Sequence, residues 1–373
     1  MQTEQEHTQV VTFARNIDVA LESRLHCLEL VDGFGIGRRH IVGRAGASIG
    51  RTEPAQIILT DSEVSRNHCR LAIEGGQLMV TDLKSTNGTF VDGVRVEGPT
   101  PLPVGAVLRV GRQSLKHEWR THREIQQSEE LDRDLEKANS YVQALLPAMN
   151  AEGPIRSDWV YQPCAKLGGD AFGYGVLSDT KFAVYLIDVS GHGAGAAMHS
   201  VAVMNLLRQR TFLPNTDLTQ PAQVLTTLNS MFPMDINAGM YFTMWYGVYD
   251  KITRRLDFAS AGHHPAYLVP ADRGAAAPLR TRNGMIGTMP ETTYRADSAE
   301  VPPGASLYLF SDGVFEIVTI DGVQWGLGDF LPALVKPPVE GLSEAKRLLA
   351  EVNRIARPGG LDDDFSLVVL TFD

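Results

Sequence analysis

Five aspartates between residues 170 and 364 stand where apolar runs begin or end. Two of them close the runs FAVYLI and SLYLFS, one follows a glycine pair, and two precede the run FSLVVL. In chain order they are Asp170, Asp188, Asp312, Asp363 and Asp364. Short continuous apolar runs predict buried strands. Carboxylates gathered at strand ends repel one another unless a cation lies among them, so the pattern predicts a metal site.

The donor atoms indicate which metal. A single aspartate beside glycine is an ordinary turn residue, and only the recurrence of the pattern favours a shared site. All the candidate ligands are oxygen atoms, and no cysteine or histidine cluster has the spacing of a zinc site. Oxygen donors favour a hard ion such as Mg²⁺ or Mn²⁺ over zinc.

Six motifs around these aspartates carry a family resemblance. In order they are GGDAF, YLIDVSGHG, MYFTMWYGVYD, FASAGHHPAYL, LYLFSDGVFE and DDDFSLVVL. Together, from Leu145 to Asp373, they resemble the bacterial SpoIIE/RsbU-like branch of the PP2C-type (PPM) serine/threonine phosphatases. The resemblance implies an α+β domain of two packed antiparallel sheets flanked by helices. It also implies two Mn²⁺ or Mg²⁺ ions that activate a water to attack phosphorus.

The same resemblance assigns the ligands. It implies that Asp188 bridges the two ions and that the backbone carbonyl of Val189 helps to hold one of them. Asp170, Asp312 and Asp363 complete the carboxylate set, and the adjacent Asp364 is a further candidate. These residues are present, which argues against an inactive, scaffolding phosphatase-like domain in an FHA-based adaptor, the alternative function. Another metal-dependent hydrolase remains a third reading, but it leaves the N-terminal half unexplained.

The N-terminal half has a different pattern. From Arg24 to Trp119, short and partly alternating apolar runs are separated by Gly, Asp and Asn, which predicts an all-β sandwich. The segments ASIGR, EVSRNHCRL and DLKSTNGTFVDG resemble the forkhead-associated (FHA) domain, which binds phosphothreonine peptides. The resemblance implies a phosphopeptide site made of Arg51, Ser65, Arg66, Thr86 and Asn87.

Each of these side chains has an expected task. Arg51 offers a bidentate charged fork to phosphate, and Ser65 adds a hydroxyl donor. Thr86 lines the pocket for the threonine methyl group, Asn87 holds the peptide backbone, and Arg66 adds charge. Elsewhere in the domain, we expect His68 to make a buried structural hydrogen bond. Gln56, where the family usually has Asp or Asn, is expected to brace a loop.

The segment between the two halves predicts a helix. Residues 120–146 are charged, contain neither Gly nor Pro, and are followed by Pro147. A heptad seam runs through Ser128, Leu131, Leu135, Ala138, Val142 and Leu145. Two interpretations are open: an amphipathic helix packed on the phosphatase domain, or a coiled-coil-like contact in a parallel dimer. The resemblance favours the dimer, because helical linkers in this branch commonly act as dimerising switches.

Composition sets the remaining limits. A chain of 373 residues with 43% hydrophobic content predicts a multidomain protein: a tail (1–23), an FHA domain (24–119), a helical linker (120–146) and a phosphatase domain (147–373). The net charge of −10 argues against nucleic acid as a partner. Three widely spaced cysteines, no signal peptide and no membrane-spanning run predict a cytoplasmic protein with reduced thiols.

Other polar residues of the phosphatase half receive structural interpretations. We expect His192 to brace its glycine-rich turn, and His263 and His264 to act in a turn and in packing. Packing is also favoured for Thr243. The expected partners are a phosphorylated protein, for which the resemblance suggests a STAS-type anti-sigma-factor antagonist, and a phosphothreonine protein or Ser/Thr kinase at the FHA domain.

Overall fold

The computed structural model describes residues 24–32, 37–191, 193–209, 216–357 and 361–373. The N-terminal tail and His192 therefore lie outside the described residues. The chain divides into two compact units, one containing the described residues up to Arg133 and the other those from Asp134 onward. Each unit is described by itself.

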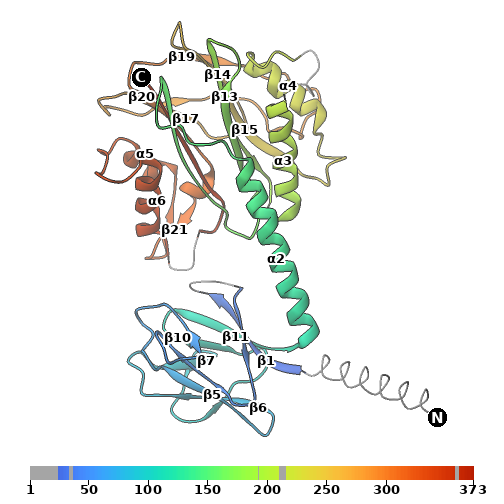
Figure 1. The fold of residues 1–373 in the computed structure, drawn as a ribbon, viewed down its shortest axis with the longest axis vertical. Coiled ribbons are helices and arrows are strands. Elements are labelled where there is room, and N and C mark those ends of the chain that lie inside the picture. The colour runs from blue at the N-terminus through green and yellow to red at the C-terminus, as the bar shows by residue number, and fades with distance from the viewer. Residues whose placement is uncertain (1–23, 33–36, 192, 210–215, 358–360) are drawn as a thin grey trace, which may run out of the picture. The chain divides into compact units, whose positions relative to one another are not determined.

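The first unit is a sandwich of two sheets (Figure 1), as the sequence predicts. Its sheets have the strand orders β2-β1-β11-β10-β7-β8 and β4-β3-β5-β6-β9, and all pairs are antiparallel except β3 with β4. The strands are β1 (Arg24–Asp32), β2 (Arg39–Val42), β3 (Ala47–Gly50), β4 (Ile57–Ile58), β5 (Cys69–Glu74), β6 (Gln77–Asp82), β7 (Thr89–Val91), β8 (Val94–Arg95), β9 (Thr100–Pro101), β10 (Val107–Val110) and β11 (Gln113–Thr121).

Alternation along these strands makes the core of the sandwich. On β5, Cys69 and Leu71 are fully buried, whereas Arg70 between them is exposed. On β10, Leu108 and Val110 are buried in the same way. Side chains of a strand point to opposite faces in turn, so each sheet presents one apolar face to the other. The loops between strands are left at the ends of the sandwich.

The second unit contains two five-stranded antiparallel sheets, with the orders β12-β23-β20-β17-β18 and β13-β14-β15-β16-β19, and a two-stranded sheet β21-β22 (Figure 1). Its strands are β12 (Ile155–Gln162), β13 (Ala171–Val176), β14 (Lys181–Val189), β15 (Phe242–Asp250), β16 (Arg255–Ala261), β17 (Ala266–Val269), β18 (Ala277–Leu279), β19 (Asp297–Glu300), β20 (Ala305–Phe310), β21 (Ile317–Val318), β22 (Gln324–Trp325) and β23 (Phe365–Phe372). This α+β architecture agrees with the prediction.

Strand β23 shows why its apolar run is continuous. Val368 and Leu370 belong to the core between the two large sheets, whereas Leu367 and Val369 belong to a second core that includes residues of α5 and α6. Because neighbouring side chains point to opposite faces, a strand that is covered on both faces must be apolar throughout.

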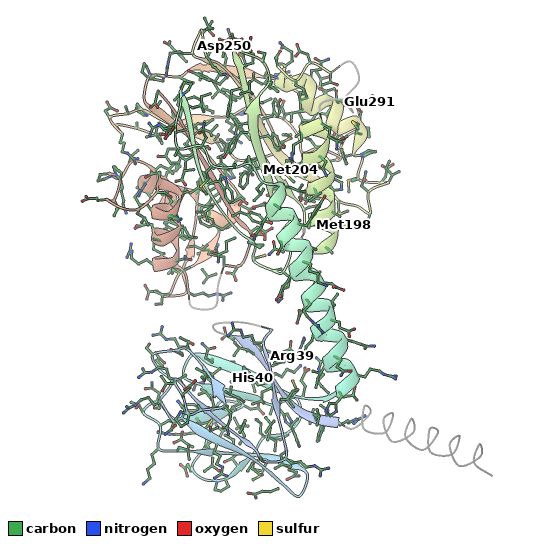
Figure 2. The ribbon with its side chains drawn as sticks, in the orientation of Figure 1. Arg39, His40, Met198, Met204, Asp250 and Glu291 are labelled. Atoms are coloured by element: carbon green, nitrogen blue, oxygen red, sulfur yellow. The ribbon has the colours of Figure 1, made fainter. Side chains whose placement is uncertain are left out.

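The helices are α2 (His122–Leu145), α3 (Ala194–Gln209), α4 (Pro221–Met231), α5 (Leu327–Leu334) and α6 (Glu344–Ile355), with a 3₁₀ turn, η1, at Asp312–Val314. Helix α3 has two distinct faces: Met204 is fully buried and Met198 is 74% exposed (Figure 2). Apolar patterns in the sequence predict helices over residues 194–210, 221–232 and 343–356, which correspond to α3, α4 and α6. The sequence did not predict α5, which is short and contains Pro332.

Helix α2 has clear signals at both ends. At its start, the amide of Thr121 donates to the Glu124 carboxylate (2.7 Å) and the Glu124 amide donates to the Thr121 hydroxyl (3.2 Å), which is a capping box. The helix ends at Leu145, two residues before Pro147. A proline disfavours the helical conformation in the residue that precedes it, so the helix stops here.

Part of the heptad seam of α2 packs against other residues of the same chain. Leu135, Ala138 and Val142 pack in a cluster with residues of the second unit, namely Leu167, Ala197 and Val201. Earlier in the seam, Leu131 is 60% exposed. Coiled-coil character is thus not shown, and the observed packing matches the alternative of a helix packed on the phosphatase domain. A dimer through this seam stays a prediction, and it would require these covered side chains to be released.

The two ends of the seam give a test of this packing. We expect Val142→Ala to lower the free energy of unfolding of the second unit by roughly 1–3 kcal/mol, because it leaves a cavity. Leu131→Ala, on the same helix, is the control and should change it by less than about 0.5 kcal/mol. Urea unfolding followed by circular dichroism measures both. If Val142→Ala and Leu131→Ala lower the free energy of unfolding equally, at a protein concentration that favours dimers, the result would instead support the coiled coil.

No helix in the described part of the chain is both long enough and apolar enough to cross a bilayer.

Candidate functional site

The register of one sheet brings two of the predicted aspartates together. In the antiparallel pair β13 and β14, Ala171 lies opposite Ile187, so Asp170 immediately precedes β13 next to Asp188. On the other side of β14, Asp188 lies opposite Thr243 of β15, and the Thr243 side chain hydrogen-bonds the Asp188 carboxylate. Packing was the favoured role of Thr243 and a hydrogen bond near the site was the alternative; the register, which places its hydroxyl at the carboxylate, matches the alternative.

The second large sheet brings the other three aspartates together. Strand β20 pairs with β23 so that Phe310 lies opposite Leu367, and the two chains stay in contact beyond this pair. The Ser311 amide donates to the Ser366 carbonyl (2.9 Å), and the Ser311 hydroxyl donates to the Asp364 carbonyl (2.8 Å). The η1 turn therefore holds Asp312 beside the segment of Asp363 and Asp364.

Asp364 connects this segment to the loop that carries Asp170. One of its carboxylate oxygens accepts from the Cys164 amide (2.9 Å), and the other accepts from the Gly169 amide (2.6 Å). The side chain is 4% exposed. Backbone amides thus occupy both carboxylate oxygens, so the main role of Asp364 is to connect the two sheets through hydrogen bonds.

Three glycines allow the close approach. A Cβ on Gly168 would lie 2.5 Å from an Asp364 carboxylate oxygen, and a Cβ on Gly169 would lie 2.9 Å from the carbonyl oxygen of Val189. A Cβ on Gly313 would lie 2.3 Å from the Asp364 carbonyl oxygen. Any side chain at these positions would push the aspartates apart. The Val189 carbonyl is accordingly close to the loop of Asp170.

The carboxylates have pKa values that fit mutual repulsion. Burial, followed by the charges of Asp312 and Asp363, raises the pKa of Asp188 to about 7. Burial and Asp363 raise the pKa of Asp312 to about 6. Burial, Asp188 and Asp364 raise the pKa of Asp170 well above its usual value. The principal charges that shift these groups are other carboxylates rather than lysines or arginines.

The donor set fits divalent cations. Asp170 is 2% exposed, and its Oδ2 atom has no hydrogen-bond partner among the described residues. A buried carboxylate oxygen without a partner is costly unless a cation or a water binds it. Carboxylate and carbonyl oxygens are the ligands that Mg²⁺ and Mn²⁺ prefer. The residues at this place are therefore suited to hold such ions.

Two residues that the sequence did not single out also lie here. The thiol of Cys164 lies with carboxylate oxygens of Asp363 and Asp364 in a group whose atoms are all within 4.8 Å of one another. Burial and these carboxylates raise the pKa of Cys164 to about 12. The buried hydroxyl of Tyr161 has no hydrogen-bond partner among the described residues. No local signal marks either residue, because Cys164 and Asp364 are 200 residues apart.

The raised pKa values predict how stability depends on pH when metal is removed. Unfolded aspartates ionise near pH 4, whereas Asp188 and Asp312 in the folded protein keep their protons to about pH 7 and about pH 6. The folded state then binds more protons, so stability falls as the pH rises from about 4 to about 7. In chelator, the unfolding midpoint of wild type should fall relative to Asp188→Asn between pH 5 and pH 7.5. If the unfolding midpoints of wild type and Asp188→Asn change with pH in parallel, the raised pKa of Asp188 would be contradicted.

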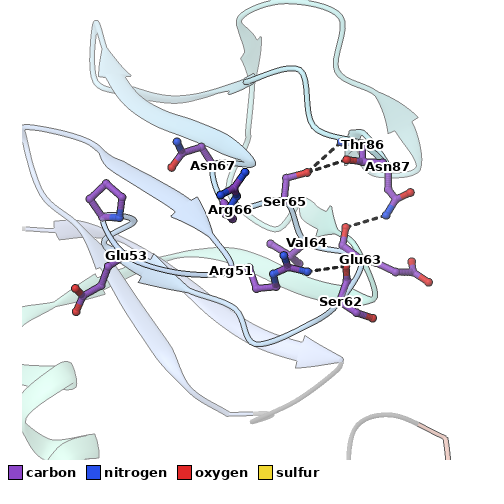
Figure 3. Close-up of a pocket in the computed structure, with 11 residues that line it drawn as sticks. Arg51, Glu53, Ser62, Glu63, Val64, Ser65, Arg66, Asn67, Thr86 and Asn87 are labelled. Atoms are coloured by element: carbon purple, nitrogen blue, oxygen red, sulfur yellow. Dashed lines mark hydrogen bonds between the residues drawn. The ribbon is translucent and has the colours of Figure 1, made fainter.

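A second site lies in the first unit. A pocket of about 600 Å³ is lined by Arg51, Ser65, Arg66, Thr86 and Asn87, the five predicted phosphopeptide-binding residues, together with residues 53–54, 62–64 and 67 (Figure 3). The lining comes from three loops at one end of the sandwich. The structure thus brings every residue of the predicted set to one hollow.

Hydrogen bonds fix these loops to one another. The Thr86 amide donates to the Ser65 hydroxyl (3.0 Å), and the Asn87 side-chain amide donates to the Glu63 carbonyl (2.8 Å; Figure 3). Arg51 lines the pocket, and its exposed guanidinium makes a long bond to the Ser62 carbonyl (3.3 Å). The chemistry offered is a cation with hydroxyl and amide donors, which suits a phosphate group.

The supporting residues behave as predicted. His68 is fully buried, accepts from the Ser65 amide (3.0 Å) and bonds the Gly88 carbonyl (3.1 Å), so it is structural. Gln56 accepts from the Ser48 amide (2.7 Å), which braces a loop. In the second unit, burial lowers the pKa of His263 to about 4, and His264 stacks on Phe310, in agreement with packing roles.

Comparisons with known proteins agree with both predicted domains. The family model described as Stage II sporulation protein E (SpoIIE) matches residues 178–373, more than half of the chain. The chain belongs to the SpoIIE family. The FHA domain model matches residues 47–111. The protein thus combines an FHA domain with a SpoIIE PP2C-type, RsbU-like phosphatase domain, as the motifs predicted.

Individual relatives cover different parts of the chain. Phosphoserine phosphatase RsbU of Bacillus subtilis is 26% identical over 271 residues, which is 70% of this chain and 76% of RsbU. FHA domain-containing protein FhaB of Mycolicibacterium smegmatis is 36% identical over 85 residues, 23% of this chain and 55% of FhaB. The SiaA-PP2C domain of Pseudomonas aeruginosa has a TM-score of 0.57 at 19% identity, covering 66% of this chain and 98% of that domain, which shows the fold.

Proposed function

We propose that this SpoIIE-family protein is a metal-dependent phosphatase that hydrolyses phosphoserine or phosphothreonine in a protein, while its FHA domain binds a phosphothreonine protein. The observation that carries the proposal is the convergence of Asp170, Asp188, Asp312 and Asp363. The first three have raised pKa values, and Asp170 has a buried oxygen without a hydrogen-bond partner among the described residues. Such a cluster is unfavourable by itself and favourable around cations.

Some residues of the site would bind the metal ions, and others position those ligands. Asp188, in the middle of the cluster, would bridge two ions, and Asp170, Asp312 and Asp363 would complete their ligands with the Val189 carbonyl. When bound, two divalent cations supply a water of lowered pKa and neutralise charge on the phosphoryl oxygens. Thr243 orients the Asp188 carboxylate through its hydrogen bond. Asp364 holds the loop of Asp170 against the other sheet through backbone amides.

The phosphoryl group is not held by an arginine that we can name. Arg156 is paired with Asp373 (2.7 Å), which directly follows β23 and is therefore separated by the whole length of that strand from the aspartates that precede it. The ions themselves, once held by the carboxylates, are therefore the main attraction for the substrate phosphate.

The resemblance and the relatives of the chain suggest a substrate and partners. RsbU is a phosphoserine phosphatase, which favours phosphoserine at the catalytic site. We propose a phosphorylated STAS-type anti-sigma-factor antagonist as substrate, and a phosphothreonine protein or a Ser/Thr kinase as ligand of the FHA domain. A cytoplasmic location and a homodimer are part of the same proposal.

Phosphate release tests the enzyme directly. The full-length protein is incubated with phosphoserine and phosphothreonine peptides in Mn²⁺, in Mg²⁺ and in chelator. We expect turnover with Mn²⁺ or Mg²⁺ and none in chelator. If no ion supports turnover while phosphothreonine peptides still bind the pocket of Arg51, the protein is an FHA-based adaptor instead.

A further inference from the structure

The second unit contains a pocket of about 330 Å³ that none of the five aspartates lines. Its walls come from residues 145–148 at and after the end of α2, from strands β13 and β14, and from helix α3, which contributes Met204 (Figure 2). Small-molecule sites in proteins usually have volumes of about 300–1,000 Å³, with mostly apolar walls and a few polar groups. The pocket therefore has room for one small molecule.

Two glycines of β13 leave this space open. Gly173 and Gly175 both line the pocket, and they point to the same face because they are two residues apart on a strand. A Cβ on Gly173 would lie 2.4 Å from the Tyr185 hydroxyl, whereas a Cβ on Gly175 would meet no atom within 4 Å. A glycine inside a strand often marks a place where another group approaches closely. Gly173 makes room for Tyr185, and Gly175 leaves a space that no described residue fills.

One buried hydroxyl in this pocket lacks a hydrogen-bond partner. Three tyrosines line the pocket, and the hydroxyls of Tyr174 and Tyr246 donate to backbone carbonyls (2.9 and 2.8 Å). Tyr185 is 6% exposed, and its hydroxyl has no partner among the described residues. A buried hydroxyl without a partner costs free energy, so its presence indicates a bound acceptor, either a water or a ligand.

A cation lies near this hydroxyl. Arg208 of α3 lines the pocket, and its exposed guanidinium donates to the Leu145 carbonyl at the end of α2 (3.2 Å). Burial raises the pKa of Tyr185, and the charge of Arg208 opposes this shift, so the guanidinium and the hydroxyl interact electrostatically. A carboxylate can accept hydrogen bonds from a tyrosine hydroxyl and from a guanidinium at the same time. A negatively charged acceptor therefore fits this place better than a water does.

We propose that this pocket binds a small amphipathic carboxylate, such as a fatty acid of medium length, with its charged group at Arg208 and Tyr185 and its apolar chain between β13 and α3. Burial of the chain against the apolar walls would contribute to the affinity. Because residues 145–148 and α3 both line the pocket, the ligand would hold the end of α2 against the phosphatase domain. The inference depends neither on the metal centre nor on turnover.

Calorimetric titration of the full-length protein with octanoate, in chelator, tests the proposal. We expect saturable binding at one site per chain. Arg208→Gln and Tyr185→Phe should each weaken binding roughly tenfold or more, because each removes a hydrogen bond to a charged group. Gly175→Val fills the open space and should abolish measurable binding. The matched control is Arg255→Gln on β16, outside the pocket, which should bind octanoate as wild type does.

Octylammonium, which has an apolar chain of the same length and the opposite charge, is the control ligand. It should bind at least about tenfold more weakly than octanoate, since Arg208 repels it. The proposal is overturned if octanoate does not bind saturably, if octylammonium binds as tightly as octanoate, or if a folded Gly175→Val binds octanoate normally. Circular dichroism checks the folding of each variant. The exposed Arg208 and the change of ligand leave the core intact, so these two comparisons remain decisive even if Gly175→Val unfolds.

Discussion

Asp188→Asn is expected to reduce metal-dependent phosphate release by at least about a thousandfold, the equivalent of roughly 4 kcal/mol of transition-state stabilisation. Asp188 lies in the middle of the cluster, and its pKa responds to Asp312, Asp363 and Asp364. An asparagine keeps the shape and the contact with Thr243 but removes the charge that would bridge the ions. Initial rates of phosphate release from a phosphoserine peptide, at saturating Mn²⁺, measure the effect.

Unfolding of the variant would not explain a loss of phosphate release in Asp188→Asn. The substitution removes a repelled carboxylate, so Asp188→Asn should be at least as stable as wild type in chelator near neutral pH. Asp257→Asn is the matched control, because Asp257 lies on β16 of the same sheet and pairs with Arg255 (2.7 Å). It should retain activity within about twofold. A fully active Asp188→Asn would contradict the proposed metal centre.

Arg51→Ala is expected to weaken binding of a phosphothreonine peptide by roughly 10- to 100-fold, because hydrogen bonds to a charged group contribute about 1.5–3 kcal/mol. The exposed guanidinium lies in the pocket with Ser65 and Thr86. Arg51→Lys should recover only part of the loss, since an ammonium keeps the charge but not the planar fork. Fluorescence anisotropy with a labelled peptide gives the dissociation constants.

The control for this experiment is another arginine of the same domain. Arg70 is exposed on β5 and is not among the residues that line the pocket, so Arg70→Ala should bind the peptide as wild type does. If Arg70→Ala and Arg51→Ala weaken binding equally, the interaction is a general attraction of charge. If Arg51→Ala binds the peptide as tightly as wild type does, the pocket is not the phosphothreonine-binding site.

The sequence by itself determined the types of residue at each site and the local elements that carry them. Asp188 and Asp312 follow apolar runs that fold as β14 and β20, and Ser65, Thr86 and Asn87 lie in loops rich in turn residues. Capping at Thr121 and the stop at Pro147 likewise set the ends of α2. These features depend on neighbouring residues, so a contiguous stretch is sufficient to encode them.

Only the tertiary structure decided which of these features meet. The register of β13 with β14 places Asp170 beside Asp188, and the bonds of Asp364 to the loop of Cys164 join the two sheets. The same packing covers Val142 of the seam and leaves Leu131 exposed. Side chains 200 residues apart come together through sheet register and core packing, which no local pattern specifies. That is why the aspartates were predictable from the sequence and the thiol beside them was not.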